Sequence, residues 1–403
     1  MKKNAETLPL MAESLYIWRI FQYLFWIIGF YLFLTLLFQP QRGVIFFWNL
    51  LIPLAPALFV LFPGLWRNIC PLASTALFSR HMKWGLKKRL STKWQGWLNL
   101  WSVLLLFLII PLRHVTFNLN GHSTALLLGC TALVAVIGSF IFEWKSFWCA
   151  GLCPVHGVER FYGGEPLASL PNAHCDYCRN CVVSCPDSTP GIFPLINDQE
   201  KTRRIASALL VGGFPGFIWG WYQVPDYHNG AGWSHLGTVY FWPILGMLFT
   251  LALYQWIRFR HPGINEIRLI RIFAALAVST YYWYRIPELF GFSPFPGDGL
   301  LIDLTEVLPF WFPYLSRGIT TAFFFWWMVF HLKLDRSWMA RPPFKKPKKE
   351  VVIQKLTGGK VVKMEPLPSK SDFSILASPL EKEFEELLQK SKKGSPKRKR
   401  KKG

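Results

Sequence analysis

The sequence predicts an all-α integral membrane bundle of about eight spans, with both termini cytoplasmic and a small cysteine-rich insert. Of its 403 residues, 52% are hydrophobic and 17% are aromatic, and the mean hydropathy is +0.25. A soluble protein of this length needs a largely polar surface, which this composition does not readily supply. A lipid bilayer is the simplest environment that accepts such a chain.

Eight apolar stretches reach the ~20 residues that a membrane-spanning helix needs. They lie near residues 16–39, 44–65, 97–117, 123–143, 205–223, 237–257, 267–287 and 316–333. The fifth stretch contains Gly212, Gly213, Pro215, Gly216 and Gly220. Glycine and proline are tolerated in spanning helices, but they also occur where such helices break. This stretch therefore fits a re-entrant segment as well as a span.

The lysines and arginines between these stretches alternate from one side to the other. Residues 66–96 and 144–204 are rich in them, whereas 224–236 and 288–315 contain none. Positively charged loops stay on the cytoplasmic side of a membrane. The pattern therefore predicts a multi-pass protein of the cell inner membrane, with both termini and residues 144–204 in the cytoplasm.

This arrangement divides the chain into four regions. We expect a four-span N-terminal membrane domain at 1–143, a cytoplasmic segment at 144–204, a four-span C-terminal membrane domain at 205–334 and a mostly disordered basic tail at 335–403. The formal net charge is +22, and basic runs beside a membrane are attracted to anionic lipid. We therefore expect the lipid bilayer, and not nucleic acid, to be the partner of this charge.

Four of the eight cysteines form one closely spaced run. Cys175, Cys178, Cys181 and Cys185, followed by Pro186, match the C-x2-C-x2-C-x3-C-P pattern with which bacterial ferredoxins bind a [4Fe–4S] cluster. A structural zinc site would need a longer gap between paired cysteines, and a cytoplasmic location disfavours disulfides. The run therefore predicts a small ferredoxin-like iron–sulfur insert near 166–200.

A second cysteine group follows the apolar hairpins. Cys149 and Cys153 come just after the fourth stretch and precede a proline, and Cys70 with its own proline holds the same place after the second. The first two hairpins thus look like a weak internal repeat. We expect Cys70, Cys149 and Cys153 to form an accessory redox or metal site at the membrane surface. The alternative is that they are small packing residues, as we expect for Cys130 within the fourth stretch.

A CxxxCP group after a transmembrane hairpin, followed by a CxxCxxCxxxCP run, resembles the membrane polyferredoxin family. That family includes the membrane ferredoxin subunit of periplasmic nitrate reductase, the nitrous oxide respiration regulator and a cytochrome oxidase assembly ferredoxin that handles copper. The resemblance covers about 45–190 and does not extend to the later spans or the tail. It implies [4Fe–4S] clusters that pass electrons to or from a partner redox protein of a respiratory chain, often drawing on the quinone pool.

The number of clusters is open, because better-known members of that family carry two consecutive four-cysteine runs and this chain carries one. In two-cluster ferredoxins the fourth cysteine of each run binds the other cluster, so Cys185 either completes the first cluster or serves a second. The seven cysteines expected at the inner face cannot fill two all-cysteine cubanes. We favour one cluster plus a labile or redox-active thiol group. A second cluster would need another ligand, such as His156 or His174.

Polar and aromatic residues on the expected outer side allow several interpretations. Four histidines could hold haem or copper, although we expect them to be solvated: His114, His122, His228 and His235. Five aromatic residues are expected to form an interfacial belt, with a quinone pocket as the alternative: Trp221, Tyr222, Tyr227, Trp233 and Trp311. Arg285 and Glu288 could pair as a functional site, but we expect them to snorkel to the interface.

Together these features predict a membrane-bound iron–sulfur electron-transfer protein, with a quinone or quinol as a membrane carrier. We expect a carrier or oxidoreductase subunit rather than a stand-alone enzyme, because the sequence has no P-loop, nucleophile elbow or HExxH motif. One alternative is a copper-handling assembly protein for a respiratory oxidase, since soft thiolates suit Cu(I). The other is a redox-sensing transporter or scaffold, which the lack of an obvious charged path within the spans disfavours.

Overall fold

The computed structural model describes residues 12–78, 85–86, 88, 90–142, 145–163, 167, 170–171, 200–261, 263–331 and 339–340. The predicted iron–sulfur run at 175–185 lies outside the described residues, and so does the tail at 335–403 except for Met339–Ala340. The predictions for both therefore stay predictions. The chain divides into two units, 1–343 and 344–403, and all described residues belong to the first.

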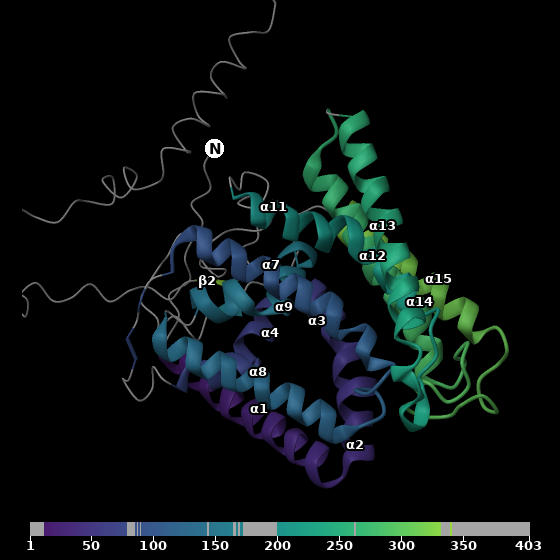
Figure 1. The fold of residues 1–403 in the computed structure, drawn as a ribbon, viewed down its shortest axis with the longest axis horizontal. Helices are drawn as coiled ribbons and strands as arrows, with labels where there is room; N and C mark the ends of the chain where they lie inside the picture. Colours follow the sequence, from purple (N-terminus) through teal and green to yellow (C-terminus); the bar gives the residue numbers. More distant parts are fainter. Residues whose placement is uncertain are drawn as a thin grey trace, which may run out of the picture. The chain divides into compact units, whose positions relative to one another are not determined.

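The described part of the N-terminal half is helical and is apolar along most of its length (Figure 1). Its elements are α1 (Ala12–Phe38), α2 (Pro40–Val44), the π-helical η1 (Ile45–Leu51), α3 (Ile52–Leu61), α4 (Pro63–Ile69), α5 (Pro71–Ala76), α7 (Thr92–Ile109), the 3-10 turn η2 (Pro111–Arg113), α8 (Gly121–Ile141), the π-helical η3 (Lys145–Leu152) and α9 (Pro154–Tyr162). Side-chain caps begin two of the three long helices in this list, α7 and α8. Ser91 accepts the Trp94 amide at the start of α7, and Asn120 accepts the first free amides of α8, as expected of these residue types.

The described part of the C-terminal half is also mainly helical. Its elements are α11 (Lys201–Ala208), the π-helical η4 (Leu209–Gly213), α12 (Phe214–Trp221), the 3-10 segment η5 (His228–Trp233), α13 (Leu236–Arg260), α14 (Glu266–Leu289), α15 (Phe312–Phe325) and the π-helical η6 (Trp326–Phe330). The strands β1 (Leu170–Pro171) and β2 (Met339–Ala340) pair in parallel, with Leu170 opposite Met339.

Five helical stretches of the described chain are long and apolar enough to cross a membrane. They are Ile17–Phe38, Pro40–Leu61, Lys93–Arg113, Gly121–Ile141 and Leu236–Arg260. These stretches confirm the membrane character and the mostly helical fold that the sequence predicts. The other three predicted spans, at 205–223, 267–287 and 316–333, are helical as well. Among them, α14 carries the buried charged residues Arg271, Arg285 and Glu288, which lower its hydropathy.

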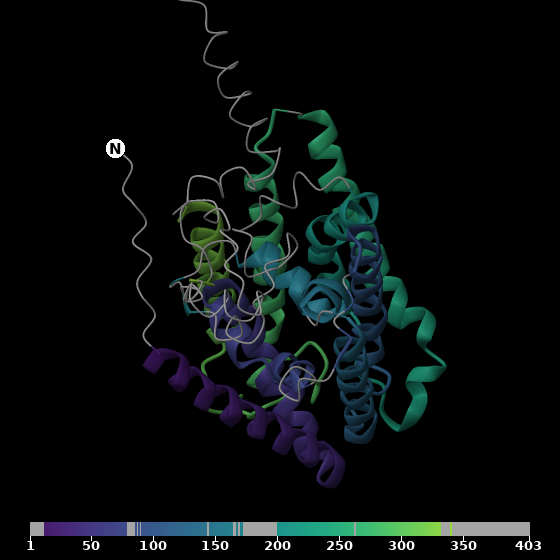
Figure 2. The same ribbon diagram turned by 90° about the vertical axis from the view of Figure 1, so that its left-hand side faces the viewer.

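Close helix packing joins the segments of the C-terminal half. Helix α12 packs against both α13 and α14, and Figure 2 shows α13 and α14 separating from the turn between them. The approach of α12 to α13 is possible because two glycines face each other. A Cβ at Gly216 would overlap the Gly246 carbonyl, and a Cβ at Gly246 would overlap the Gly216 carbonyl. The fifth stretch, in which the sequence allows a break, is helical from Lys201 to Trp221, with the π-helical η4 in its middle.

Tyr282 of α14 bridges two backbone groups of α3 that do not pair with each other. Its hydroxyl donates to the Pro53 carbonyl at 2.7 Å and accepts the Ala57 amide at 2.9 Å. These are the two backbone groups that would otherwise pair with each other in a regular helix. A side chain inserted in this way opens the helix locally, and it ties α3 to α14 beside the cavity described below.

The glycine contact predicts that Gly216→Ala destabilises the protein. Alanine normally favours a helix over glycine by about 1 kcal/mol, but here its methyl group would force α12 and α13 apart, at a cost of about 1–3 kcal/mol. The measurement is thermal unfolding of the full chain in detergent. Gly237→Ala in α13 is the matched control, because a Cβ there meets nothing within 4 Å. Equal melting temperatures for the two variants would contradict the packing argument.

Candidate functional site

The residues with the strongest sequence signal, Cys175, Cys178, Cys181 and Cys185, lie outside the described residues. Their role as ligands of a [4Fe–4S] cluster is therefore untested and stays a prediction. The described chain instead provides three features that bear on function. These are a pair of cysteine–proline corners, a large apolar cavity, and a buried network of charged side chains.

The two cysteine–proline corners have the same local geometry. Cys70 has φ −58° and ψ 116° and caps α5, which begins at Pro71. Cys153 has φ −71° and ψ 115° and caps α9, which begins at Pro154. Proline at the first position of a helix fits both starts, since its fixed φ is helical and it lacks an N–H that would be unpaired. The weak internal repeat thus extends to the backbone of both corners.

The thiols at these corners are half-buried and lie near each other. Burial raises the pKa of Cys70 to about 11, and burial followed by the charge of Cys70 raises the pKa of Cys153 to about 12, so both are protonated at neutral pH. Cys149 packs against the same cluster, around Trp148. Among the described residues, no group of three or more His, Cys, Asp or Glu side chains is close enough to hold a metal ion. The accessory site at Cys70, Cys149 and Cys153 stays a prediction.

A buried ion pair holds the two corners together. Arg67 of α4 donates from Nε to Glu159 of α9 at 2.7 Å, and its Nη2 lies 3.2 Å from Nδ1 of His156. Burial lowers the pKa of His156 to about 4, so its ring is neutral. Because Arg67 precedes Cys70 by three residues and Glu159 follows Cys153 by six, this pair fixes the relative positions of the two thiols.

A large apolar cavity begins beside the second corner. Its volume is about 270 Å³, close to the lower limit of roughly 300 Å³ for small-molecule sites. Val155, only two residues after Cys153, lines one end together with Trp66, and Arg113 and Trp221 line the other. Of the described residues in its wall, Arg113 is the only charged one. The cavity therefore extends from the cysteine corners to the C-terminal ends of α7 and α12. This end is called the outer end below, because the sequence predicts that it faces the outer side.

Three polar atoms without partners lie at or behind the outer end of the cavity, and of the residues that carry them only Tyr281 is part of the described wall. The hydroxyls of Tyr222 and Tyr281, and Nε of Arg285, are buried and form no hydrogen bond among the described residues. Tyr281 lines the cavity, and its hydroxyl lies beside the Arg285 guanidinium. Unpaired buried polar groups are rare and call for an explanation. An oxygen atom of a bound molecule would satisfy them.

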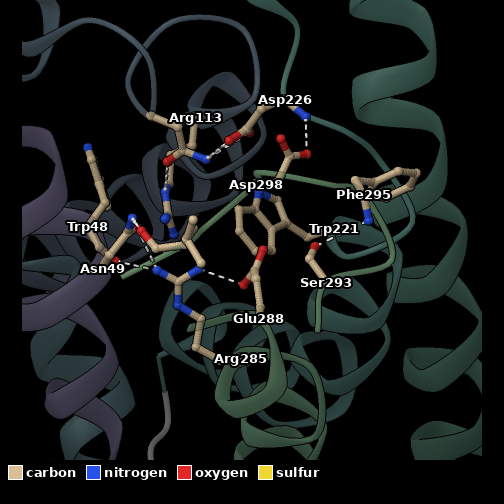
Figure 3. Close-up of polar contacts among 12 residues, drawn as sticks. Trp48, Asn49, Arg113, Trp221, Asp226, Arg285, Glu288, Ser293, Phe295 and Asp298 are labelled. Atoms are coloured by element: carbon tan, nitrogen blue, oxygen red, sulfur yellow. Dashed lines mark hydrogen bonds and ion pairs between the residues drawn. The ribbon is translucent and has the colours of Figure 1, made fainter. Parts of the chain in front are cut away.

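Arg285 is the most deeply buried charged residue of this region (Figure 3). It is 2% exposed, and Glu288, one turn later on α14, is 6% exposed. Nη1 of Arg285 donates to Glu288 at 2.5 Å, and Nη2 donates to the Trp48 carbonyl at 2.8 Å and to Asn49 Oδ1 at 2.7 Å. The guanidinium thus links α14 to η1, and both its charge and most of its donors are matched.

The Trp48 carbonyl is available to Arg285 because of a proline. In η1 the Ile52 amide donates to the Phe47 carbonyl, so the next carbonyl in the π-helical pattern, that of Trp48, would accept from residue 53. Pro53 has no N–H to donate. Arg285 supplies the missing donor, which explains why the charge is buried at this place.

A second group of polar residues surrounds Asp226, in the loop between α12 and η5. Nδ1 of His114 lies 2.7 Å from Asp226 Oδ1, and Asn118 donates to both carboxylate oxygens. Arg113 donates from Nε to Asn118 at 2.9 Å, and its guanidinium stacks on the rings of Trp48 and Trp221. The Asp226 amide in turn donates to Asp298 at 2.8 Å (Figure 3).

Several expectations for the outer side are wrong. Arg285 and Glu288 do not snorkel, because both are buried and paired with each other. His114 is not solvated but is 4% exposed, whereas His122, His228 and His235 are exposed as expected. Trp221 and Tyr222 are each 5% exposed and so do not belong to an interfacial belt. One expectation within the fourth stretch is also wrong, because Cys130, expected as a packing residue, is exposed on α8.

Comparisons with protein-family models, with curated proteins and with solved structures found no match to this chain. What the described residues define on their own is a helical membrane protein with an apolar cavity that ends in a buried polar network. The sequence did not single out Arg113, Asp226 or Tyr281 as members of a site, because no motif marks them and their partners are distant in the chain, as Asn118 is from Asp226.

The burial of the Arg285–Glu288 pair predicts a large cost for removing one partner. Glu288→Ala would leave a buried guanidinium uncompensated and lower the free energy of unfolding by about 3–5 kcal/mol. Glu266→Ala is the matched control, since its pair with Arg258 is half-exposed, with an N···O distance of 3.0 Å, and contributes about 0–1 kcal/mol.

Thermal unfolding in detergent measures both losses. The double variant Arg285→Met/Glu288→Met should be more stable than Glu288→Ala, because it buries no unpaired charge. Equal stability of Glu288→Ala and Glu266→Ala would contradict a large cost of leaving Arg285 without its partner.

Proposed function

We propose that this chain is a membrane-bound iron–sulfur electron-transfer protein that exchanges electrons with a quinone in the apolar cavity. In this proposal Cys175, Cys178, Cys181 and Cys185 bind one [4Fe–4S] cluster, which supplies one-electron chemistry when bound. The chain would cross the inner membrane eight times and hold residues 144–204 in the cytoplasm. The segment after Cys153 would bring the cavity near the cluster.

The position of the cavity carries this proposal. A quinone has an apolar ring and tail and two polar oxygens, and sites for such molecules are mainly apolar with a few well-placed polar groups. The cavity wall is mainly apolar. Arg113 and the Tyr281 hydroxyl lie at its outer end, and the hydroxyl of Tyr162, the other tyrosine of the wall, donates to the Leu210 carbonyl. Its other end reaches Val155, beside the cysteine corner. A redox molecule held there would lie between the polar network and the cysteines.

The residues of the chain have separate roles in this proposal. Tyr281 would donate to a quinone oxygen, while Phe217 and Val278 would enclose the ring and exclude water. The Arg67–Glu159 pair would keep Cys70 and Cys153 in place beside the cluster segment. The partner on the cytoplasmic side would be a redox protein that accepts or donates one electron at a time.

A copper-handling role is the second candidate, and one observation favours it. Cys70 and Cys153 are neighbouring, half-buried thiols, and two thiolates suit Cu(I). Titration of the purified protein with Cu(I) under a competing chelator distinguishes the two functions. Binding that Cys70→Ser and Cys153→Ser abolish, with the iron content unchanged, would favour copper handling.

The proposed cluster predicts about four iron atoms and four sulfides per chain, the content of one cubane. The measurement is iron and sulfide analysis with EPR of the full chain, purified anaerobically in detergent and reduced. Cys178→Ser should lose most of the iron and the signal, because a cubane with three protein ligands is labile. Cys130→Ser, at a cysteine outside the proposed site, should retain both.

The pair Cys149→Ser/Cys153→Ser tests the number of clusters in the same assay. Iron content unchanged in this double variant means that the accessory cysteines hold no cluster. If the wild type contains more than four iron atoms per chain and the double variant loses the excess, the accessory cysteines do hold a cluster. Wild-type protein without iron, after anaerobic purification, would contradict the proposed function.

A further inference from the structure

The oxidation of a quinol releases two protons along with two electrons, and the cavity wall has no good acceptor for them. The titratable groups of its described wall are Arg113, Tyr162 and Tyr281. Arginine stays protonated in proteins, and the Tyr162 hydroxyl already donates to the Leu210 carbonyl. A carboxylate or an imidazole is needed, and it has to lie directly behind the wall.

His114 and Asp226 lie in that position at the outer end. The ring of His114 stacks on Trp221, which lines the cavity, with 4.4 Å between ring centroids. His114 also follows Arg113, another residue of the wall. Asn118 joins Arg113 to Asp226 through hydrogen bonds of 2.9 Å. The pair is therefore separated from the cavity by a single layer of side chains.

The hydrogen bonds of His114 fix where its proton can move. Nε2 lies 3.1 Å from the Trp221 carbonyl, and because a carbonyl only accepts, Nε2 keeps its hydrogen. Nδ1 faces Asp226 at 2.7 Å, a distance at which the two atoms share a proton. The pair can therefore take up a proton at Asp226 or Nδ1 and release it again without any change of tautomer at Nε2.

A path for the proton continues from Asp226 to Asp298 in the loop after α14. Burial tends to raise the pKa of Asp226, but the hydrogen bond and the charge of His114 outweigh it and hold the pKa below its usual value. Asp298, which accepts the Asp226 amide, lies in the loop after α14, and burial raises its pKa to about 6. The other charged groups that face Asp226 are Arg113, His114 and Glu288.

We infer that His114 and Asp226 form a proton outlet between the outer end of the cavity and the outer aqueous phase. This inference rests on the proposed exchange of electrons with a quinone. When a quinol is oxidised to a quinone, its two electrons would leave one at a time through the one-electron acceptor of the chain to the redox partner, and its two protons would leave one after the other through the His114–Asp226 pair. The pair passes the protons to water on the outer side, where Asp298 lies. Proton release would thus occur on the side opposite the cysteine corners.

The test uses the full-length holoprotein in detergent, with decylubiquinol as donor and ferricyanide as one-electron acceptor. Each decylubiquinol reduces two ferricyanide ions and releases two protons, so the reaction balances. Asp226→Asn and His114→Gln should lower kcat roughly 100-fold, the usual effect of removing an acid–base group. KM for the quinol and the iron content should not change. Added formate should restore much of the rate, because a small acid can carry the protons instead.

Two controls separate a proton outlet from a structural role. His122→Gln, at an exposed histidine of the same side, should keep the wild-type rate, and Asp226→Glu should recover most of it. Wild-type kcat in Asp226→Asn and His114→Gln would overturn the outlet, and so would a loss that formate does not repair and that a rise in KM accompanies. If the wild-type protein has its iron but does not oxidise the quinol, the proposed quinone exchange fails and the outlet fails with it.

Discussion

The buried guanidinium of Arg285 is the constraint on which the outer half of the structure depends. A charge that is 2% exposed in an apolar helical assembly has to be neutralised and hydrogen bonded, or the fold is not stable. Glu288 supplies the opposite charge, and the Trp48 carbonyl, left without a donor by Pro53, accepts a hydrogen bond. The loop after α14 closes over this pair at Gly299, where φ is +66° and any Cβ would meet the two side chains. One charge thereby fixes α14, η1 and an outer loop relative to one another.

A second buried pair holds the opposite end. Arg67 and Glu159 join the segments that carry Cys70 and Cys153, so the two ends are each held by an ion pair and the space between them is apolar. Apolar side chains alone would close such a space if helices were free to move together. Here the two ion pairs, with the Tyr282 bridge to the opened α3, keep the helices at positions that leave a cavity of about 270 Å³.

The sequence was sufficient for features that depend on local composition, and insufficient for those that depend on contacts between distant segments. Length and hydropathy located the helices, and the residue pattern of the Cys–Pro corners indicated two equivalent turns. The same reasoning assigned Arg285 to the interface, because it could not reveal that Pro53, more than 200 residues earlier, frees a carbonyl for it. His114 was assigned to solvent for the same reason, since its partner Asp226 is 112 residues away. The cavity could not be predicted at all, because it arises from the packing of several helices.

The measurement that tests the central claim most directly is the reduction of the cluster by a quinol bound in the cavity. Anaerobically oxidised full-length protein is mixed with decylubiquinol or its naphthoquinol counterpart, and the EPR signal of the reduced cluster is followed with time. The account predicts a signal in the wild type, its loss in Val278→Phe, which would fill the cavity, and its retention in Leu248→Phe, at an exposed position of α13. Dithionite should reduce the cluster in all three proteins. Equal reduction by the quinol in Val278→Phe and in the wild type would contradict the account, because electrons would then reach the cluster without passing through the cavity.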